Sequence, residues 1–282
     1  MIESLLRLPP GPVNLNQYAT DATPGWDDGK SEGKETLAEL GDPLSDLQER
    51  LFAEGVADVG HGRAVLLVLQ GMDTSGKGGV LRHTVGLVDP QGVRITSFKA
   101  PSDEEKKHDF LWRIRKALPS AGHIGVFDRS HYEDVLIARV RKLAPAEEIE
   151  RRYDAINSFE TEVLGAGITI VKCMLHISPE TQKERLLARL DKPEKYWKFN
   201  PGDIDERGRW SEYREAYEIA LERTNTEVAP WHVIPSDRKW YRNLAIAQVL
   251  HDTLARMAPA WPAADYDISE QRSRLEDEAP IA

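Results

Sequence analysis

Residues 64–79 read AVLLVLQGMDTSGKGG, and this stretch decides the fold. The segment Ala64–Leu69 is apolar throughout and has the length of a buried strand. The turn Gly71–Gly79 follows with the spacing G-x-x-x-x-G-K, and a helical pattern of apolar residues continues to Val88. Backbone N–H groups in such a turn can surround a phosphate, so the order strand, loop, helix predicts a phosphate-binding loop. The alternative is an ordinary glycine-rich turn.

Within this loop, we expect the ammonium of Lys77 to contact the transferred phosphoryl group and the rest of the loop to surround phosphates. The residues expected to surround them are Thr74, Ser75, Gly76, Gly78 and Gly79. Gly78 stands where a serine or threonine usually gives a hydroxyl to Mg²⁺. We therefore predict that Asp73 replaces the missing hydroxyl as a metal ligand, since a carboxylate beside phosphates requires a cation between them.

The rest of the chain alternates between short apolar runs and longer segments of helical length. Strands are expected at residues 93–98, 124–127, 168–177 and 231–234, in addition to the first. Helices are expected at 104–118, 131–164 with a break near Pro145, 179–227 and 239–257. Continuous apolar strands between helices predict an α/β fold, in which a parallel five-stranded sheet is flanked by helices on both faces.

Three regions are predicted along the chain. Residues 1–42 are expected to form an extended N-terminal arm, after which Asp42 and Pro43 are typical of a helix start. Residues 43–258 form the domain that contains the phosphate loop, with a lid at about 183–210. Residues 259–282 form an acidic C-terminal tail that is expected to be frayed or packed on a neighbouring subunit.

The overall charge limits the function classes. The chain has 37 Lys and Arg residues against 47 Asp and Glu residues, a net charge of −10 that argues against nucleic-acid binding. The acidity lies at the two ends, which leaves residues 61–260 with a net charge of +2. Cys173 is the only cysteine and is expected in the core. No apolar stretch is long enough to span a membrane, and the N-terminus lacks the pattern of a signal peptide, so a cytoplasmic location is expected.

A second acidic residue ends the third apolar run, which reads IGVFDRS over residues 124–130. Ligands of open α/β sheets bind beside the carboxyl ends of the strands, so we predict that Asp128 is a second Mg²⁺-binding carboxylate. A carboxylate here could instead cap the next helix. Arg129 could stabilise charge on the phosphoryl group during transfer, or could be an ordinary surface arginine.

A basic cluster follows the fourth apolar run. Arg185, Arg189 and Lys192 recur at helical spacing before Pro193, and Lys195 and Lys198 flank two aromatic residues. The cluster could be a solvated helix face with ion pairs. Its place after the fourth strand favours a mobile lid that closes over phosphates.

Four segments together resemble the polyphosphate kinase 2 family: GMDTSGKGG, FDRSHYEDVL, KYWKFNPGDIDERGRW and APWHVIPSDRKWYRN. The resemblance implies a P-loop kinase fold with a helical lid, and reversible, Mg²⁺-dependent transfer of a phosphoryl group between inorganic polyphosphate and a nucleotide. It also implies a dimer or tetramer. By this likeness, Asp73 and Asp128 bind metal and act in catalysis with Lys77 and Arg129. The lid cations from Arg185 to Lys198 bind polyphosphate.

The stretch SHYEDVL at residues 130–136 is most similar to the subgroup that accepts both AMP and ADP, which makes Glu133 a candidate nucleotide-binding residue. Adenine nucleotides are the expected acceptors, with guanine nucleotides left open. The main alternative is an ATP-dependent nucleoside monophosphate kinase, which Gly78 disfavours. A nucleotide-binding switch without rapid turnover would need a γ-phosphate sensor loop and a base-specificity motif, neither of which is found.

Overall fold

The structure is a computed structural model that describes residues 2–58 and 62–278. Its centre is a five-stranded sheet in the order β2-β3-β1-β4-β5, in which all neighbouring strands are parallel. The strands are β1 Ala64–Gln70, β2 Val93–Ser97, β3 Ile124–Asp128, β4 Ile168–His176 and β5 Trp231–Pro235. The predicted parallel sheet and all five of its strands are therefore confirmed.

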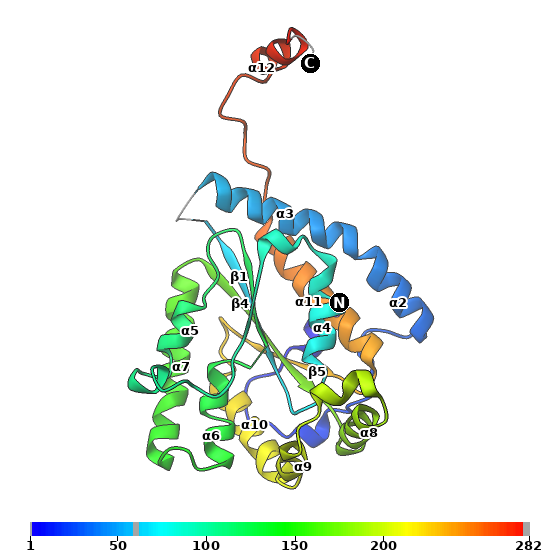
Figure 1. The fold of residues 1–282 in the computed structure, drawn as a ribbon, viewed down its shortest axis with the longest axis vertical. Coiled ribbons are helices and arrows are strands. Elements are labelled where there is room, and N and C mark those ends of the chain that lie inside the picture. The colour runs from blue at the N-terminus through cyan, green and yellow to red at the C-terminus, as the bar shows by residue number, and fades with distance from the viewer. Residues whose placement is uncertain (1, 59–61, 279–282) are drawn as a thin grey trace.

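Helices cover both faces of the sheet (Figure 1). One face carries α5 Trp112–Lys116, α6 Ile137–Val140, α7 Ala146–Gly165 and α10 Trp210–Thr224. The other face carries α3 Gly41–Ala57, α4 Lys77–His83 and α11 Lys239–Met257, with α1 Ile2–Leu6 and α2 Lys30–Glu39 packed near α11. The α/β architecture expected from the sequence is thus confirmed.

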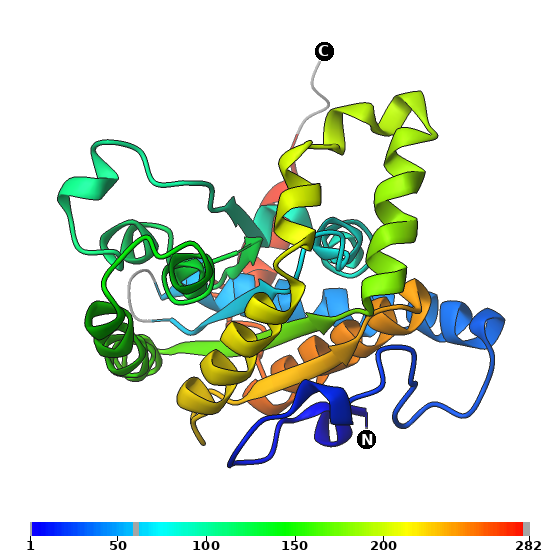
Figure 2. The same ribbon diagram turned by 90° about the horizontal axis from the view of Figure 1, so that it is seen from below.

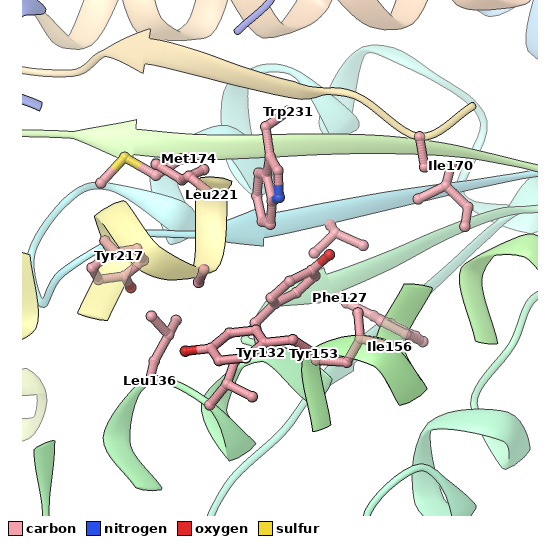
Figure 3. Packing of buried hydrophobic residues seen from close by; sticks show 14 of the residues in the cluster. Phe127, Tyr132, Leu136, Tyr153, Ile156, Ile170, Met174, Tyr217, Leu221 and Trp231 are labelled. Atoms are coloured by element: carbon pink, nitrogen blue, oxygen red, sulfur yellow. The ribbon is translucent and has the colours of Figure 1, made fainter. Parts of the chain in front are cut away.

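Alternation along the strands divides the core into two clusters. In β1, Leu66 and Val68 belong to the cluster under α7 and α10, whereas Val65, Leu67 and Leu69 belong to the cluster under α3 and α11. Figure 3 shows part of the first cluster, in which aromatic side chains such as Phe127, Tyr132 and Trp231 pack among aliphatic ones. Burial on both faces explains why the β1 sequence is continuously apolar. The edge strand β2 is less buried and contains polar residues.

The N-terminal arm differs from the prediction. Residues 30–39, expected to be extended, form helix α2, and a short 3₁₀ turn occupies Leu15–Gln17. Helix α2 lacks an apolar stripe because its buried contact is Gly33, where a side chain would collide with the ring of Trp240 on α11. Helix α3 begins at Gly41 rather than at Pro43, and no side chain caps its first turn. Because α2 contacts α11 through a glycine and not through apolar side chains, its sequence has no apolar periodicity that would predict a helix.

Two other helical segments are more broken than expected. Residues 104–118 form only the 3₁₀ turn Glu105–Lys107 and the short helix α5. Residues 179–227 divide into α8 Pro179–Leu190, the 3₁₀ segment Pro193–Lys198 (η6), α9 Gly202–Arg207 and α10. Figure 2 shows α8 and the start of α10 rising from the sheet, with the connection between them above α4. The break at Pro145 and the last helix, residues 239–257, match the predictions.

The C-terminal tail leaves the body of the protein. After α11 the chain extends to a short helix, α12 Ile268–Glu276, which stands away from the sheet and its helices (Figure 1). None of the helices in residues 2–58 and 62–278 combines the length and the apolar character that crossing a membrane requires.

Candidate active site

The phosphate loop connects β1 to α4 through backbone conformations that favour glycine. Gly71 has φ +150° and Gly76 has φ +113°. A Cβ atom on Gly71 would lie 2.6 Å from the carbonyl oxygen of Leu175, so no other residue fits there without displacement of the backbone. The N–H of Gly71 donates to the Tyr217 hydroxyl at 3.1 Å, which ties the start of the loop to α10.

Two arginines hold the loop from behind. Arg185 of α8 donates to the carbonyl oxygens of Thr74 and Ser75, at 2.8 and 3.1 Å, and also to those of residues 236 and 237. Arg242 of α11 donates to the carbonyl of Ser75 at 3.2 Å and lies beneath the glycines at positions 76 and 79. Arg242 is only 2% exposed, and its burial together with the nearby Arg185 lowers its pKa to about 9. These arginines fix the loop and add positive charge beneath it.

Lys77 lies at the start of α4, where its ammonium donates to the carbonyl of Gly71 at 2.8 Å. Burial and the neighbouring Arg129 lower its pKa, and Asp73, Asp128 and Glu133 partly oppose this shift. The lysine predicted to contact the phosphoryl group therefore sits among the three acidic residues predicted for the site.

Asp73 and Asp128 both lie close to Arg129. The Arg129 guanidinium donates to Asp73 Oδ1 at 3.0 Å, and the Ser97 hydroxyl donates to Asp128 Oδ2 at 3.3 Å. Burial disfavours the charged form of Arg129, but Asp73 and Glu133 outweigh this effect and raise its pKa. The turn after β3 is capped by the hydroxyl of Ser130, which accepts from the N–H of residue 132. Ser130, and not Asp128, therefore caps the turn that follows β3.

Glu133 belongs to the 3₁₀ turn His131–Asp134 (η5) that follows β3. Burial raises the pKa of its carboxyl group, and the nearby Arg129 and Lys77 oppose the shift. When the Gln70 amide is oriented so that both its nitrogen and its oxygen form hydrogen bonds, the nitrogen donates to Glu133 Oε1 at 3.1 Å and the oxygen accepts from Ser130. Glu133 is thus held close to the phosphate loop.

Two hollows of opposite character meet at Asp73 and Arg129. The larger has a volume of about 700 Å³ and is lined mainly by basic residues. The smaller, of about 260 Å³, is lined by Glu133, Asp203 and Glu206, by the aromatic residues of α10, and, among the residues that the structure describes, by a single cation, Arg129. Asp73 and Arg129 line both. This geometry suits a polyanion on one side and a neutral, hydrogen-bonding ligand on the other, with a reacting group between them.

A comparison with protein-family models matches residues 28–261 to the model described as polyphosphate kinase 2 (PPK2). The chain belongs to the polyphosphate kinase 2 family. The match begins within the segment predicted to be an extended arm and includes α2.

Individual relatives agree with this assignment. The chain is 44% identical to an AMP/ADP-polyphosphate phosphotransferase of Meiothermus ruber, over 90% of this chain and 93% of the relative. It is 39% identical to an ADP-polyphosphate phosphotransferase of Rhodopseudomonas palustris, over 89% and 88%. A crystal structure of polyphosphate kinase 2 from Arthrobacter aurescens TC1 superposes with a TM-score of 0.94 at 51% identity, covering 98% of this chain and 97% of that one. The P-loop kinase fold implied by the resemblance is therefore confirmed.

Most of the residues predicted for polyphosphate kinase 2 chemistry meet at the larger hollow, hereafter the basic cleft. Its lining includes Asp73, Lys77, Asp128, Arg129 and the loop positions 74, 76, 78 and 79. Ser75 is different. It is fully buried, its N–H donates to the carbonyl of Met72, and its hydroxyl packs beneath Gly71. Ser75 therefore supports the loop from inside instead of facing the cleft.

The predicted lid cations divide into groups. Arg185, Arg189, Lys195 and Lys198 line the basic cleft, but Arg185 directs its four terminal N–H bonds at backbone carbonyls. Arg189 donates to the carbonyl of Lys198 at 2.9 Å and to Asp203 at 3.2 Å. Lys192 follows the end of α8 at Leu190, so it does not share a helix face with the two arginines. It does not line the cleft.

Several cationic side chains of the cleft were missed by sequence reasoning. They are Arg82, Lys99, Lys239 and Arg242. Arg82 lies four residues after Gly78, one turn along α4. This spacing places Arg82 on the same helix face as the phosphate loop, so the sequence could have identified it as a cation of the cleft. Lys239 and Arg242 come from α11, whose sequence pattern only indicates a covering helix. Packing of α11 against α4 brings them to the cleft.

Proposed function

We propose that this protein transfers a phosphoryl group between inorganic polyphosphate and adenine nucleotides, accepting both AMP and ADP, in a reversible reaction. The observation that carries the proposal is the meeting of a basic cleft and a smaller, acidic hollow at Asp73 and Arg129. The name of the M. ruber relative supports polyphosphate with both AMP and ADP, and the name of the R. palustris relative supports polyphosphate with ADP.

Polyphosphate would occupy the basic cleft. In the described part of the chain, the side chains of Arg82, Lys99, Lys195 and Lys239 form no ion pair with a carboxylate, so their charges are available to a ligand. Burial and the neighbouring cations Arg185, Arg242, Lys195 and Lys192 lower the pKa of Lys239. Cations so close to one another favour a bound polyanion, which would offset their repulsion.

The nucleotide would occupy the smaller hollow. The carboxylates of Glu133, Asp203 and Glu206 accept hydrogen bonds, which suits ribose hydroxyls and the amino group of adenine. The rings of Trp210 and Tyr213 offer apolar surface to a base. The terminal phosphate of the nucleotide would then lie toward Arg129, the only cation among the described residues of the lining.

Asp73 and Asp128 would hold Mg²⁺ at this junction. The described residues contain no cluster of three or more metal-binding side chains. Two carboxylates nevertheless fit, because Mg²⁺ is commonly bound by one or two carboxylates with substrate phosphates and water completing its shell. When bound, the ion supplies positive charge that stabilises the phosphate oxygens during transfer.

The chain's own residues would orient and stabilise the transfer. A nucleotide phosphate oxygen attacks the terminal phosphorus of polyphosphate, and the bond from that phosphorus to the bridging oxygen breaks, which leaves polyphosphate one unit shorter. Lys77 and Arg129 would offset negative charge on the oxygens of the transferred group. Closure of the lid would exclude water and so prevent hydrolysis.

We also propose that the protein is a homo-oligomer, as the resemblance implies. Support comes from α12, which stands away from its own chain (Figure 1) and exposes Ile268 and Leu275, seven residues apart on one helix face. Light scattering of the full-length protein tests this. An oligomer that dissociates when both residues are replaced by Asp supports a role for α12, and a monomeric wild type contradicts the proposal. The cytoplasmic location stays a prediction.

Nucleotide chromatography tests the proposed activity. Purified protein is incubated with Mg²⁺ and either AMP or ADP, with polyphosphate or ATP as the only phosphoryl donor. We expect polyphosphate to convert AMP to ADP and then to ATP. Phosphorylation of AMP that requires ATP would instead identify a nucleoside monophosphate kinase.

A further inference from the structure

A lysine lies at the centre of an apolar face of the sheet. Lys172 of β4 is fully buried, and the residues on the same face of its strand are Ile170 and Met174. The adjacent strands place Val68 and Trp231 beside it. A charged group is retained in such surroundings only where it is paired and hydrogen-bonded, so its partners indicate what it does.

The Lys172 ammonium donates three hydrogen bonds inside the protein. Its acceptors are Glu160 Oε2 of α7 at 2.7 Å, the carbonyl of Thr224 at 2.7 Å and the Tyr132 hydroxyl at 3.1 Å. The Tyr132 hydroxyl donates in turn to Glu160 Oε1 at 2.6 Å. Three donated bonds require the charged ammonium, since a neutral amine has only two N–H bonds. Burial opposes ionisation of Glu160, but Lys172 and His131 outweigh it and lower the pKa of that carboxyl group.

This network joins two elements that line the smaller hollow. Tyr132 belongs to η5, and the next residue, Glu133, lines the hollow. Thr224 ends α10, which contributes Tyr213 and Tyr217 to the same lining. Figure 3 shows Tyr132 close to Trp231, with Tyr217 on α10 to one side.

Trp231 strengthens the connection to α10. Its indole N–H donates to the Thr224 hydroxyl at 2.9 Å, and its ring packs edge-on against Tyr132, with ring centroids 4.7 Å apart. The Thr224 hydroxyl donates to the carbonyl of Ala220 at 2.6 Å. The last turn of α10 is therefore held through both the backbone carbonyl and the side-chain hydroxyl of Thr224.

We propose that Lys172, Glu160 and Tyr132 are positioning residues that hold η5 and α10 at the separation required for nucleotide binding. The inference rests on the proposed function, because it takes the smaller hollow as the nucleotide site. These three residues line neither hollow, so they act through Glu133 and the tyrosines of α10. Directional hydrogen bonds between charged groups restrict the separation of two elements more narrowly than apolar packing does.

The geometry further predicts that the two substrates respond differently. The basic cleft is lined by the phosphate loop, α4, α8, η6, α11, the ends of β2 and β3, and Arg129, which lines both hollows, and none of these contributes a residue to the network. Loss of the network should therefore weaken nucleotide binding and leave polyphosphate binding unchanged. A purely structural role would affect both substrates together.

The test uses the double variant Lys172→Met/Glu160→Leu, which removes both charges and leaves neither of them buried without its partner. Kinetics are measured with each substrate varied at saturating amounts of the other. We expect the KM for ADP to rise about tenfold and the KM for polyphosphate to stay within about twofold. The matched control is Tyr153→Phe, because Tyr153 lies in the same cluster but takes no part in the network and lines neither hollow. It should leave both KM values unchanged.

A KM for ADP that stays near the wild-type value in the folded double variant would overturn the inference, and so would equal rises for both substrates. If the double variant does not fold, Tyr132→Phe removes only the hydroxyl that joins η5 to the pair. We expect it to give the same split between substrates, smaller in size, and an unchanged KM for ADP would overturn the inference.

Calorimetric titration with ADP alone separates this inference from the proposed function. A wild type that binds ADP but does not use polyphosphate contradicts the proposed function and leaves the positioning role intact. A folded double variant that binds ADP as tightly as the wild type contradicts the positioning role and leaves the proposed function intact.

Discussion

The Arg129 guanidinium meets the Asp73 carboxylate at 3.0 Å, at the junction of the two hollows. Both side chains are partly exposed, so the ion pair contributes only about 0–1 kcal/mol to stability. Arg129 also has φ +93°, an unfavourable conformation that costs about 1–3 kcal/mol. Its N–H donates to the carbonyl of Leu69 at 3.3 Å, which ties this backbone to β1. The backbone strain at Arg129 costs stability, and its ion pair with Asp73 returns little of it. This indicates that Arg129 is held here because the site requires its position, and not because it stabilises the fold.

Replacing either predicted metal-binding carboxylate should abolish most of the activity. We expect Asp73→Asn and Asp128→Asn each to lower kcat by about 100-fold or more, because each removes negative charge that would hold the metal ion. The melting temperature should change little, since the ion pair of Asp73 is partly exposed. Steady-state kinetics and thermal unfolding of both variants provide the check. Near-normal turnover in either variant would contradict the two-carboxylate site.

The unpaired cations of the basic cleft should select for long polyphosphate. We expect Arg82→Gln and Lys239→Gln to raise the KM for long-chain polyphosphate several-fold, about 0.5–1.5 kcal/mol in binding, and to weaken its dependence on salt. Triphosphate should be affected less, because it is too short to reach every cation. Lys34→Gln on α2 is a matched control, since Lys34 is exposed and does not line the cleft. Equal effects on both chain lengths would contradict an extended site.

Two glycines of the phosphate loop should respond in opposite ways to alanine. Gly71→Ala adds a Cβ atom 2.6 Å from the carbonyl of Leu175 at φ +150°, and we expect it to cost about 2 kcal/mol or more. Gly78 has no neighbour within 4 Å of such an atom and lies inside α4. Gly78→Ala should therefore leave stability unchanged or raise it by up to about 1 kcal/mol. Chemical denaturation measures both, and a tolerated Gly71→Ala would contradict the strained-loop geometry.

Stability should depend on pH through Glu133. Burial raises the pKa of this carboxyl group above its ordinary value, so the folded state binds its proton more tightly than the unfolded state does. The ionised carboxylate consequently destabilises the fold increasingly as pH rises from the ordinary value of 4.5 through the raised pKa.

Glu133→Gln should accordingly raise the melting temperature at pH 7 to 8, and this gain should disappear below about pH 4. The same variant should bind ADP more weakly if Glu133 contacts the nucleotide. Melting curves across this pH range are the measurement, with Asp154→Asn on the exposed side of α7 as the control. A lower melting temperature for Glu133→Gln at pH 8 would contradict the raised pKa.

Much of the fold was predictable because its strands and its phosphate loop follow from the pattern of residues close together in the sequence. The apolar runs of β1 and β4 identify strands buried on both faces, and the spacing of Gly71, Gly76 and Lys77 identifies the loop between β1 and its helix. Asp128 could be placed at the site from its position at the end of β3 alone, since carboxyl ends of parallel strands lie along one edge. Helix α2 could not be predicted, because its contact with Trp240 depends on the absence of a side chain at Gly33.

By itself, the sequence determined the order of strands and helices, the phosphate loop and the resemblance that points to polyphosphate. Only the tertiary structure decided which charges face the cleft. Arg185 and Ser75 turn toward the backbone of the loop, whereas Arg82 and Lys239 come to the cleft from two different helices. It also decided that Lys172, within an apolar strand, is paired with Glu160. Local periodicity reports which residues share a face, but the pairing of charges depends on contacts between segments that are distant in sequence.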